Sequence, residues 1–174
     1  MPPDPPPPET ADTAPGSLCT ACGLCCDGTL FHIVRLQPAD SARQLSALGM
    51  KLRRRKKDPY FTQPCAFLHD CRCAIYEHRP QRCRHFECRV LQRLQNDEIT
   101  PVAAHALIRQ ARQIACGIEV QLASGDDTAA HLPLLERCEA ALAAIPSGTP
   151  ASSNLSAALQ ELQRLLRAEF HALG

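Results

Sequence analysis

The stretch CTACGLCC, residues 19–26, decides how the first half of this chain folds. Its two-residue spacers allow neighbouring thiolates to turn back toward one ion, and Gly23 relaxes the backbone between two of them. Adjacent side chains usually diverge, so one ion is not expected to bind both Cys25 and Cys26. We expect these two residues to serve different metals, or one to bind metal and the other to pack in the core.

Cysteine is also unusually frequent in the composition. The chain has 174 residues and 11 cysteines, and nine of these lie between Cys19 and Cys88. The sequence does not start with the basic and then apolar pattern of a secretory signal, so we expect a cytoplasmic protein with reduced thiols. In that compartment, metal binding is favoured over disulfides.

Two further segments supply the other cysteines of this half. Residues 65–73 (CAFLHDCRC) and 83–88 (CRHFEC) add five thiols to the four of the first stretch. Together they offer more thiolates than one tetrahedral site can use. Two four-thiolate sites, or one cluster and one zinc, would use eight of them.

The residues around these cysteines are poor in large apolar side chains. Of the 80 residues from 19 to 98, only 20 are Val, Ile, Leu, Met, Phe or Tyr. So small a core offsets little of the chain entropy, whereas a structural zinc contributes roughly 10–16 kcal/mol to folding. We therefore expect this block to be largely unfolded without metal.

The spacing leaves the identity of the metal open. CxxCxxC with a distant fourth cysteine is typical of a [4Fe–4S] cluster, but ferredoxin-type motifs continue to Cys-Pro, and here Cys26 follows at once. The expected cofactor is an iron–sulfur cluster or zinc, and the spacing slightly favours the cluster. Four histidines could replace a thiol, although a surface position is expected for each: His32, His69, His78 and His85.

The sequence predicts an α+β fold that is mostly helical. Short strands are expected over 31–36, 60–62 and 73–76. Helices are expected over 38–48 and 80–94, and Cys83 and Cys88 could break the second of these into two turns. Three amphipathic helices should follow, the first starting at Thr100 and Pro101, the second at Asp126 or Asp127, and the third at Ser153 or Asn154. Cys116 and Cys138 fall on apolar helix faces and are expected in the core.

These patterns divide the chain into three parts. We expect a disordered proline-rich leader over 1–16, a cysteine-cluster metal-binding domain over 17–96, and a three-helix extension over 99–174. No stretch is long and apolar enough for a transmembrane helix, so no membrane partner is expected. The formal charge is +1, and the basic run 51–57 (KLRRRKK) is expected to be a solvated connector, so nucleic acid is not an expected partner.

Three motifs in order resemble a known family. They are Cys19-x-x-Cys22-Gly-x-Cys25-Cys26, then Pro64-Cys65-x-Phe-Leu, then Cys73-x-Ile-Tyr-x-x-Arg79-Pro80-x-x-Cys83-Arg-x-Phe-x-Cys88. Over roughly residues 17–95 the chain resembles the CxxCxxCC, or YkgJ-type, cysteine-cluster proteins, which are described as zinc- or iron-chelating domains or iron–sulfur proteins. The resemblance implies that Cys71 is a spare thiol. It implies the following metal ligands: Cys19, Cys22, Cys25, Cys26, Cys65, Cys73, Cys83 and Cys88.

We therefore expect a binding protein that chelates an iron–sulfur cluster, zinc or both, with cluster carriage or redox sensing as its activity. A second hypothesis is a metal-dependent modifying enzyme, because the family that the chain resembles includes a flagellin lysine methylase. No signature for binding a methyl donor is present, so no catalytic residue is assigned and catalysis is not expected. A third hypothesis is an adaptor in which zinc only stabilises the fold and the helices or residues 51–57 bind an unknown protein partner.

Overall fold

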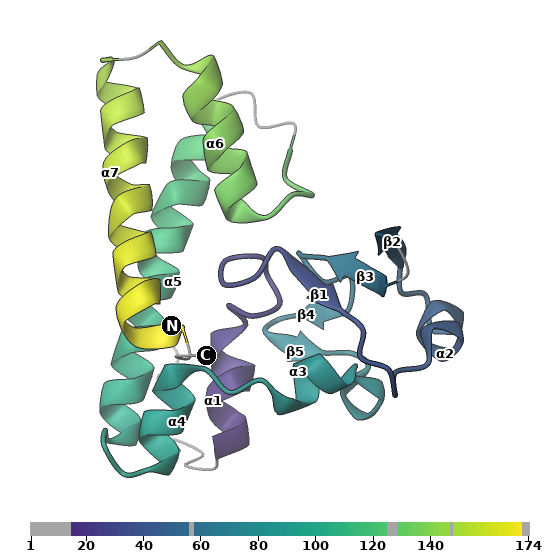
Figure 1. Ribbon diagram of the computed structural model, residues 1–174. Coiled ribbons are helices and arrows are strands. Elements are labelled where there is room, and N and C mark those ends of the chain that lie inside the picture. The colour runs from purple at the N-terminus through teal and green to yellow at the C-terminus, as the bar shows by residue number, and fades with distance from the viewer. Residues whose placement is uncertain (1–14, 56–57, 125–128, 147, 172–174) are drawn as a thin grey trace, which may run out of the picture.

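The computed structural model describes residues 15–55, 58–124, 129–146 and 148–171 of the chain (Figure 1). The predicted leader therefore lies outside the described residues except for its last two positions. A bundle of helices stands on one side, and a smaller unit with short strands packs beside it (Figure 1). This is a mostly helical α+β fold, as predicted. No helix in the described part is long and apolar enough to cross a membrane.

Long helices from the C-terminal half form most of the bundle. They are α5 (Pro101–Ala123), α6 (Leu134–Ala144) and α7 (Pro150–Leu165), which continues as a π-helical turn, η2 (Leu166–Phe170). The start of α5 was predicted correctly: Pro101 is its first residue, and the Thr100 side chain accepts a hydrogen bond from the Ala103 amide. Two shorter helices, α1 (Pro15–Cys22) and α4 (Arg89–Gln95), pack on α5 from the cysteine-rich half.

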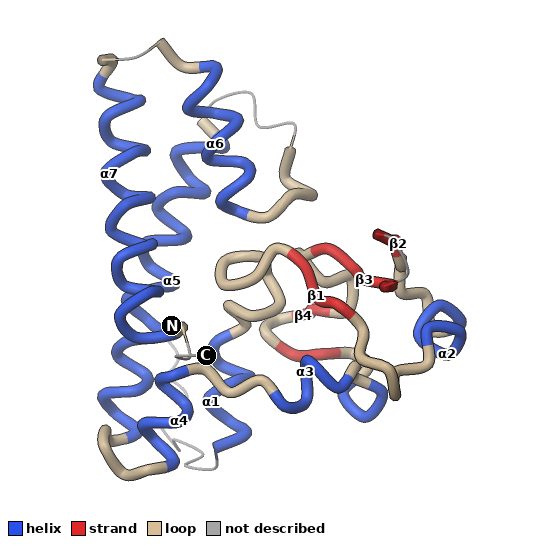
Figure 2. Tube along the Cα trace, in the orientation of Figure 1, coloured by secondary structure: helices blue, strands red, loops and turns tan. Residues whose placement is uncertain are grey.

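The strands lie in the residues between α1 and α4 (Figure 2). One antiparallel sheet has the order β1 (Ile33–Arg35), β3 (Asp58–Thr62), β2 (Arg53–Arg55). A second, two-stranded sheet pairs β4 (Leu68–His69) with β5 (Arg72–Cys73). The helical segments of this unit are α2 (Ala42–Ala47), the 3₁₀ turn η1 (Tyr76–His78) and α3 (Gln81–His85).

Two separate apolar cores hold the molecule together. The larger joins the bundle helices with Leu18 and Leu24 from the first cysteine stretch, and it surrounds Phe170 and Ile118. The smaller lies under the three-stranded sheet, where Val34 and Phe61 face each other across β1 and β3. The smaller core contains these buried residues: Val34, Leu36, Leu45, Met50, Phe61 and Ile75.

Several predicted helix boundaries were wrong for local reasons. Helix α6 begins at Leu134 rather than after Asp126 or Asp127, which lie outside the described residues, because Pro133 disfavours helical backbone at the residue before it. Helix α7 begins at Pro150, since the Thr149 side chain accepts a hydrogen bond from the Ser152 amide and caps the helix earlier than expected.

The cysteine-rich half also differs from the prediction. The strand expected over 73–76 ends at Cys73, before the 3₁₀ turn that begins at Tyr76. The helix expected over 80–94 is two helices, α3 and α4, because the chain is extended at Phe86 and Cys88. The helix expected from 38 starts only at Ala42, where the Ser41 side chain caps it. Residues 53–55, expected in a connector, form an edge strand on β3. The domain boundaries stay a prediction.

Candidate metal centre

The first group of thiols lies where α1 meets α4. Helix α1 carries Cys19 and ends at Cys22, after which Gly23 turns the chain with a φ of +71°. Leu18 and Leu24, on either side of this turn, are almost fully buried in the larger core and anchor it. Cys25 and Cys88 pack against the same core, Cys88 from the position just before α4.

Burial and mutual repulsion act on the thiols of this first group. The pKa of Cys22 is raised to about 12, chiefly by burial; a hydrogen bond from the Leu24 amide lowers it, and repulsion from the Cys88 and Cys19 sulfurs adds to the increase. Burial also raises the pKa of Cys25, with repulsion from Cys22 and Cys88. Each thiol is therefore protonated at neutral pH in the metal-free fold.

The second group of thiols lies around the smaller core. The Cys65 amide donates a 2.8 Å hydrogen bond to the Cys26 carbonyl oxygen, so these two residues are neighbours despite their separation in sequence. Cys73 lies on β5 opposite Leu68, and Cys83 lies on α3. The side chains of Cys65, Cys73 and Cys83 pack against the smaller core.

The electrostatics of the second group match those of the first. Burial raises the pKa of Cys26 to about 12, followed by repulsion from Cys65, Cys83 and Cys73. Burial likewise raises the pKa of Cys83 to about 12, with Cys65 and Cys73 adding to it. The sulfur neighbours that raise the pKa of Cys26, Cys65 and Cys83 are thus members of the same group.

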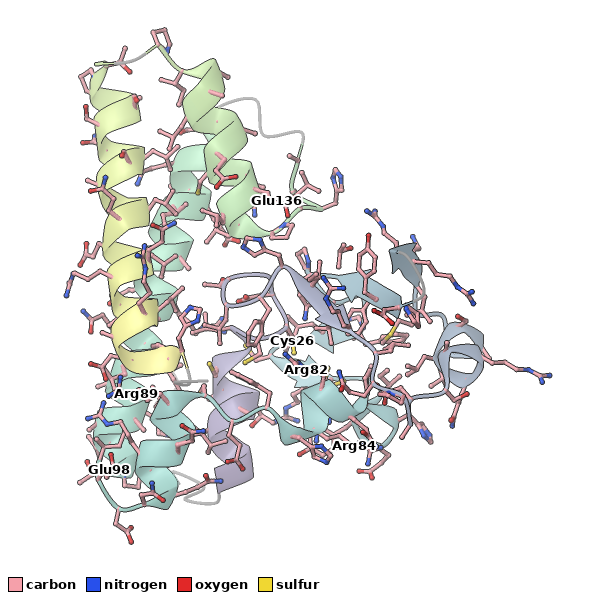
Figure 3. All side chains as sticks on the ribbon, viewed as in Figure 1. Cys26, Arg82, Arg84, Arg89, Glu98 and Glu136 are labelled. Atoms are coloured by element: carbon pink, nitrogen blue, oxygen red, sulfur yellow. The ribbon has the colours of Figure 1, made fainter. Side chains whose placement is uncertain are left out.

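The two groups are therefore separated at the Cys25–Cys26 peptide bond. Apart from burial, the pKa of Cys25 is raised most by Cys22 and Cys88, and then by Cys26 and Cys19, while the pKa of Cys26 is raised by Cys65, Cys83 and Cys73. The apolar surroundings divide at the same point, because Cys25 packs on the larger core and the partners of Cys26 pack on the smaller one. Cys26 itself lies between the bundle and the sheet unit (Figure 3).

The donor set fits a thiophilic metal in chemistry and number, because each group offers four thiols. The positions of the thiols do not form a metal site in this conformation: among the described residues, no three Cys, His, Asp or Glu side chains are arranged to hold one metal. The sulfurs of a group would have to lose their protons and draw together when metal binds.

Two arginines act on the thiol groups. The positive charge of Arg79 lowers the pKa of Cys83 against the larger effect of burial, and it acts in the same direction on Cys19. Arg112, from the middle of α5, donates to the Cys22 carbonyl oxygen at 2.7 Å. Sequence reasoning missed Arg112, because nothing in an amphipathic helix 90 residues away marks one arginine as a partner of the cysteine loop.

Two arginines that directly follow cysteines in the sequence donate to backbone groups. Arg84 donates to the backbone carbonyl oxygens of Arg79 and Glu77, and Arg89 donates to that of Ala168. Figure 3 shows Arg89 beside the helical bundle and Arg84 at the far end of α3, on opposite sides of Cys26.

Cys71, expected to be a spare thiol, lies close to the first group. Its sulfur is 2.7 Å from the Arg112 Nη1 atom, and its backbone has a φ of +63°. A side chain on Gly23 would come within 3.1 Å of this sulfur, so the turn after α1 and Cys71 pack tightly. The ligand set implied by the resemblance does not include this thiol.

Gln63 is a second residue that sequence reasoning missed. It is only 2% exposed, and its Nε2 atom donates a 2.9 Å hydrogen bond to the Cys25 carbonyl oxygen. Its backbone amide donates to the His32 carbonyl oxygen at the start of β1, again at 2.9 Å. The Oε1 atom is buried without a hydrogen-bond partner among the described residues. In the sequence, only its position directly before the Pro64-Cys65 motif indicates that Gln63 lies near the cysteines.

The remaining candidates from the sequence lie at the surface or in the bundle. His69, His78 and His85 are exposed, and the His32 Nδ1 atom lies 3.9 Å from the Glu136 carboxylate. Cys138 is fully buried, as predicted, whereas Cys116 is exposed and the prediction of a core position for it was wrong. Helix α5 turns Ala115 and Ile118 inward, which leaves Cys116 on its outer face.

Comparison with known proteins gives one match. The family model CxxCxxCC, described as a putative zinc- or iron-chelating domain, matches residues 18–105, which is half of the chain. No curated protein and no solved structure matches the sequence. The matched region contains all eight of the cysteines in the two groups.

Proposed function

The chain belongs to the CxxCxxCC family of zinc- or iron-chelating domains, and from that premise we propose that it binds metal at two separate four-cysteine sites. The first site consists of Cys19, Cys22, Cys25 and Cys88. The second consists of Cys26, Cys65, Cys73 and Cys83. The observation that carries the proposal is the division of the thiols between the two cores: Cys22, Cys25 and Cys88 pack on the larger core, and Cys65, Cys73 and Cys83 pack on the smaller one.

The first site is proposed to hold a [4Fe–4S] cluster. Three of its cysteines follow each other at two-residue intervals and the fourth is distant, which is the usual ligand pattern of such clusters. Cys19 is exposed, so one edge of the site is open to solvent. An accessible cluster can exchange electrons or be handed on, and we therefore propose redox sensing or cluster carriage as the activity.

The second site is proposed to hold a structural zinc. Its ligands come from four separate segments, which four bonds to one ion would tie together around a core of few apolar residues. This role explains how so small a sheet unit can be stable.

An enzyme that modifies a substrate would need a binding cavity beside the metal. The described residues enclose a cavity of about 300 Å³, lined among others by Leu30, Leu134 and Leu162. None of the described cysteines lines it. This cavity therefore gives the proposed metal sites no substrate pocket, and metal binding is the proposed function.

The test is metal analysis of anaerobically purified protein together with its visible absorption. We expect about four iron atoms and one zinc per chain, with an absorption band typical of an iron–sulfur cluster. Cys19→Ser should remove the iron and retain the zinc, whereas Cys83→Ser should remove the zinc. Cys116→Ser, at an exposed position, is the matched control and should change neither. Protein that takes up no metal would refute the proposal.

A further inference from the structure

The segment 63–65 holds both backbone carbonyl groups of the adjacent cysteines. The Gln63 side chain donates to the Cys25 carbonyl oxygen at 2.9 Å, and the Cys65 amide donates to the Cys26 carbonyl oxygen at 2.8 Å. The orientation of a peptide group fixes the direction of the side chains on either side of it. Two consecutive carbonyl groups are thus held at the point where the thiols separate.

We infer that Gln63 is a positioning residue that directs Cys25 and Cys26 into different metal sites. The inference rests on the proposed function, and it adds a residue outside the cysteine set to the machinery of metal binding. Without the bond from Gln63, the peptide group between the two cysteines could rotate. Either thiol could then turn toward either site.

Gln63 is itself held firmly enough for this role. It follows Thr62, the last residue of β3, and its backbone amide donates to the His32 carbonyl oxygen. The loop after Cys26 packs against it, because a side chain on Gly28 would come within 3.5 Å of the Gln63 Cβ atom and 3.1 Å of the Pro133 Cα atom. The sheet thus provides a rigid base from which the amide reaches the cysteine loop.

Packing alone does not account for a glutamine at this position. Its Oε1 atom is buried and has no partner in the described part of the chain, which destabilises the fold. A methionine of similar volume would avoid that cost and fill the same space. What only the amide supplies is the hydrogen bond to Cys25.

The test combines Gln63→Met with a serine at each of the adjacent cysteines, in full-length protein purified anaerobically. With Gln63 present, Cys25→Ser should lose iron and keep zinc, and Cys26→Ser should lose zinc and keep iron. With Gln63→Met, the remaining cysteine can serve either site, so the two serine variants should have similar iron-to-zinc ratios. We expect the difference between the iron-to-zinc ratios of the two serine variants to fall by about tenfold. Removal of a residue that orients a metal ligand typically costs about 10- to 100-fold in metal affinity, and the expected change is at the lower end of that range.

Two further variants distinguish loss of the hydrogen bond to Cys25 from a general effect of substitution. Gln63→Leu likewise removes the amide donor to the Cys25 carbonyl oxygen and leaves no polar atom at the position, so it should behave like Gln63→Met. Gln113→Met, on the exposed face of α5, is the matched control and should leave the ratios unchanged. Circular dichroism of each variant reports whether the bundle has folded.

The results separate failure of the inference from failure of the proposed function. If unsubstituted protein binds no metal, the proposed function is wrong. If it binds both metals, and the serine variants keep their separate iron and zinc losses in folded Gln63→Met and Gln63→Leu proteins, only the positioning role is refuted.

Discussion

The Arg112 guanidinium lies 2.7 Å from the Cys71 sulfur and, through the same Nη1 atom, 2.7 Å from the Cys22 carbonyl oxygen. Arg112 belongs to α5 in the helical bundle, Cys71 to the turn between β4 and β5, and Cys22 to the end of α1. One side chain therefore connects three parts of the molecule at the edge of the proposed cluster site. This contact connects the helical bundle to the proposed cluster site.

We predict that Arg112→Gln weakens the first site. The variant loses the charged donor to the Cys22 carbonyl oxygen, and the loop after α1 becomes free to move. Metal release from this site to a competing chelator should accelerate by about 10- to 100-fold, as is typical when a residue that orients a ligand is removed. Arg109→Gln, exposed on the same helix, is the control. Equal release rates for the two variants would show that the contact with Cys22 has no such role.

Metal binding should depend steeply on pH. The pKa values of Cys22, Cys26 and Cys83 are raised to about 12, chiefly by burial, so these thiols carry protons until metal displaces them. Binding should release up to about four protons per site, and zinc affinity should increase as the pH rises from 6 to 8. Titration calorimetry in buffers of different ionisation enthalpy measures the number of protons released. A value near zero would mean that the thiols are already ionised in the metal-free protein.

The metal-free fold should lose stability in alkaline solution. A thiol in the unfolded chain ionises near pH 8.5, whereas Cys22, Cys26 and Cys83 keep their protons in the folded chain up to about pH 12. Between these values the folded state binds more protons, so the free energy of unfolding falls as the pH rises. Denaturant unfolding of chelator-treated, reduced protein at pH 7 and pH 10 measures the change. Equal or greater stability at pH 10 would contradict the pKa shifts.

Cys138 and Cys116 should respond differently to substitution by serine. Cys138 is fully buried in the larger core, so Cys138→Ser places a hydroxyl group there and should cost about 1–3 kcal/mol of unfolding free energy. Cys116 is exposed, and Cys116→Ser should change stability by less than about 0.5 kcal/mol. Both variants should keep the wild-type metal content. Loss of metal in Cys138→Ser with the bundle still folded would mean that this thiol contributes to a site.

The fold class and the start of α5 could be predicted because they depend on local signals. Thr100 and Pro101 mark a helix start through their own chemistry, and apolar residues at helical spacing mark the bundle. The exposure of Cys116 could not be predicted with the same certainty, because a residue at the margin of an apolar face turns inward or outward according to its neighbours. The start of α6 depends on Pro133, which disfavours helical backbone at the residue before it, whereas Asp126 and Asp127 are the residues that favour a helix cap in the sequence.

The candidate site was only partly predictable for a different reason. The divergence of Cys25 and Cys26 follows from their adjacency, and it was expected. Which of the other thiols joins each of them depends on long-range packing, as the bond between Cys65 and Cys26 illustrates. Gln63 and Arg112 are ordinary polar residues in sequence, and only the fold brings them to the cysteine loop.

The central claim is that the eight cysteines form two independent metal sites. Native mass spectrometry of the anaerobically purified chain counts the bound groups directly, first in the unsubstituted protein and then in Cys88→Ser and Cys73→Ser. The account predicts two bound groups, with each substitution removing a different one and leaving the other in place. A chain without bound metal, or one in which either substitution removes both groups together, would contradict it.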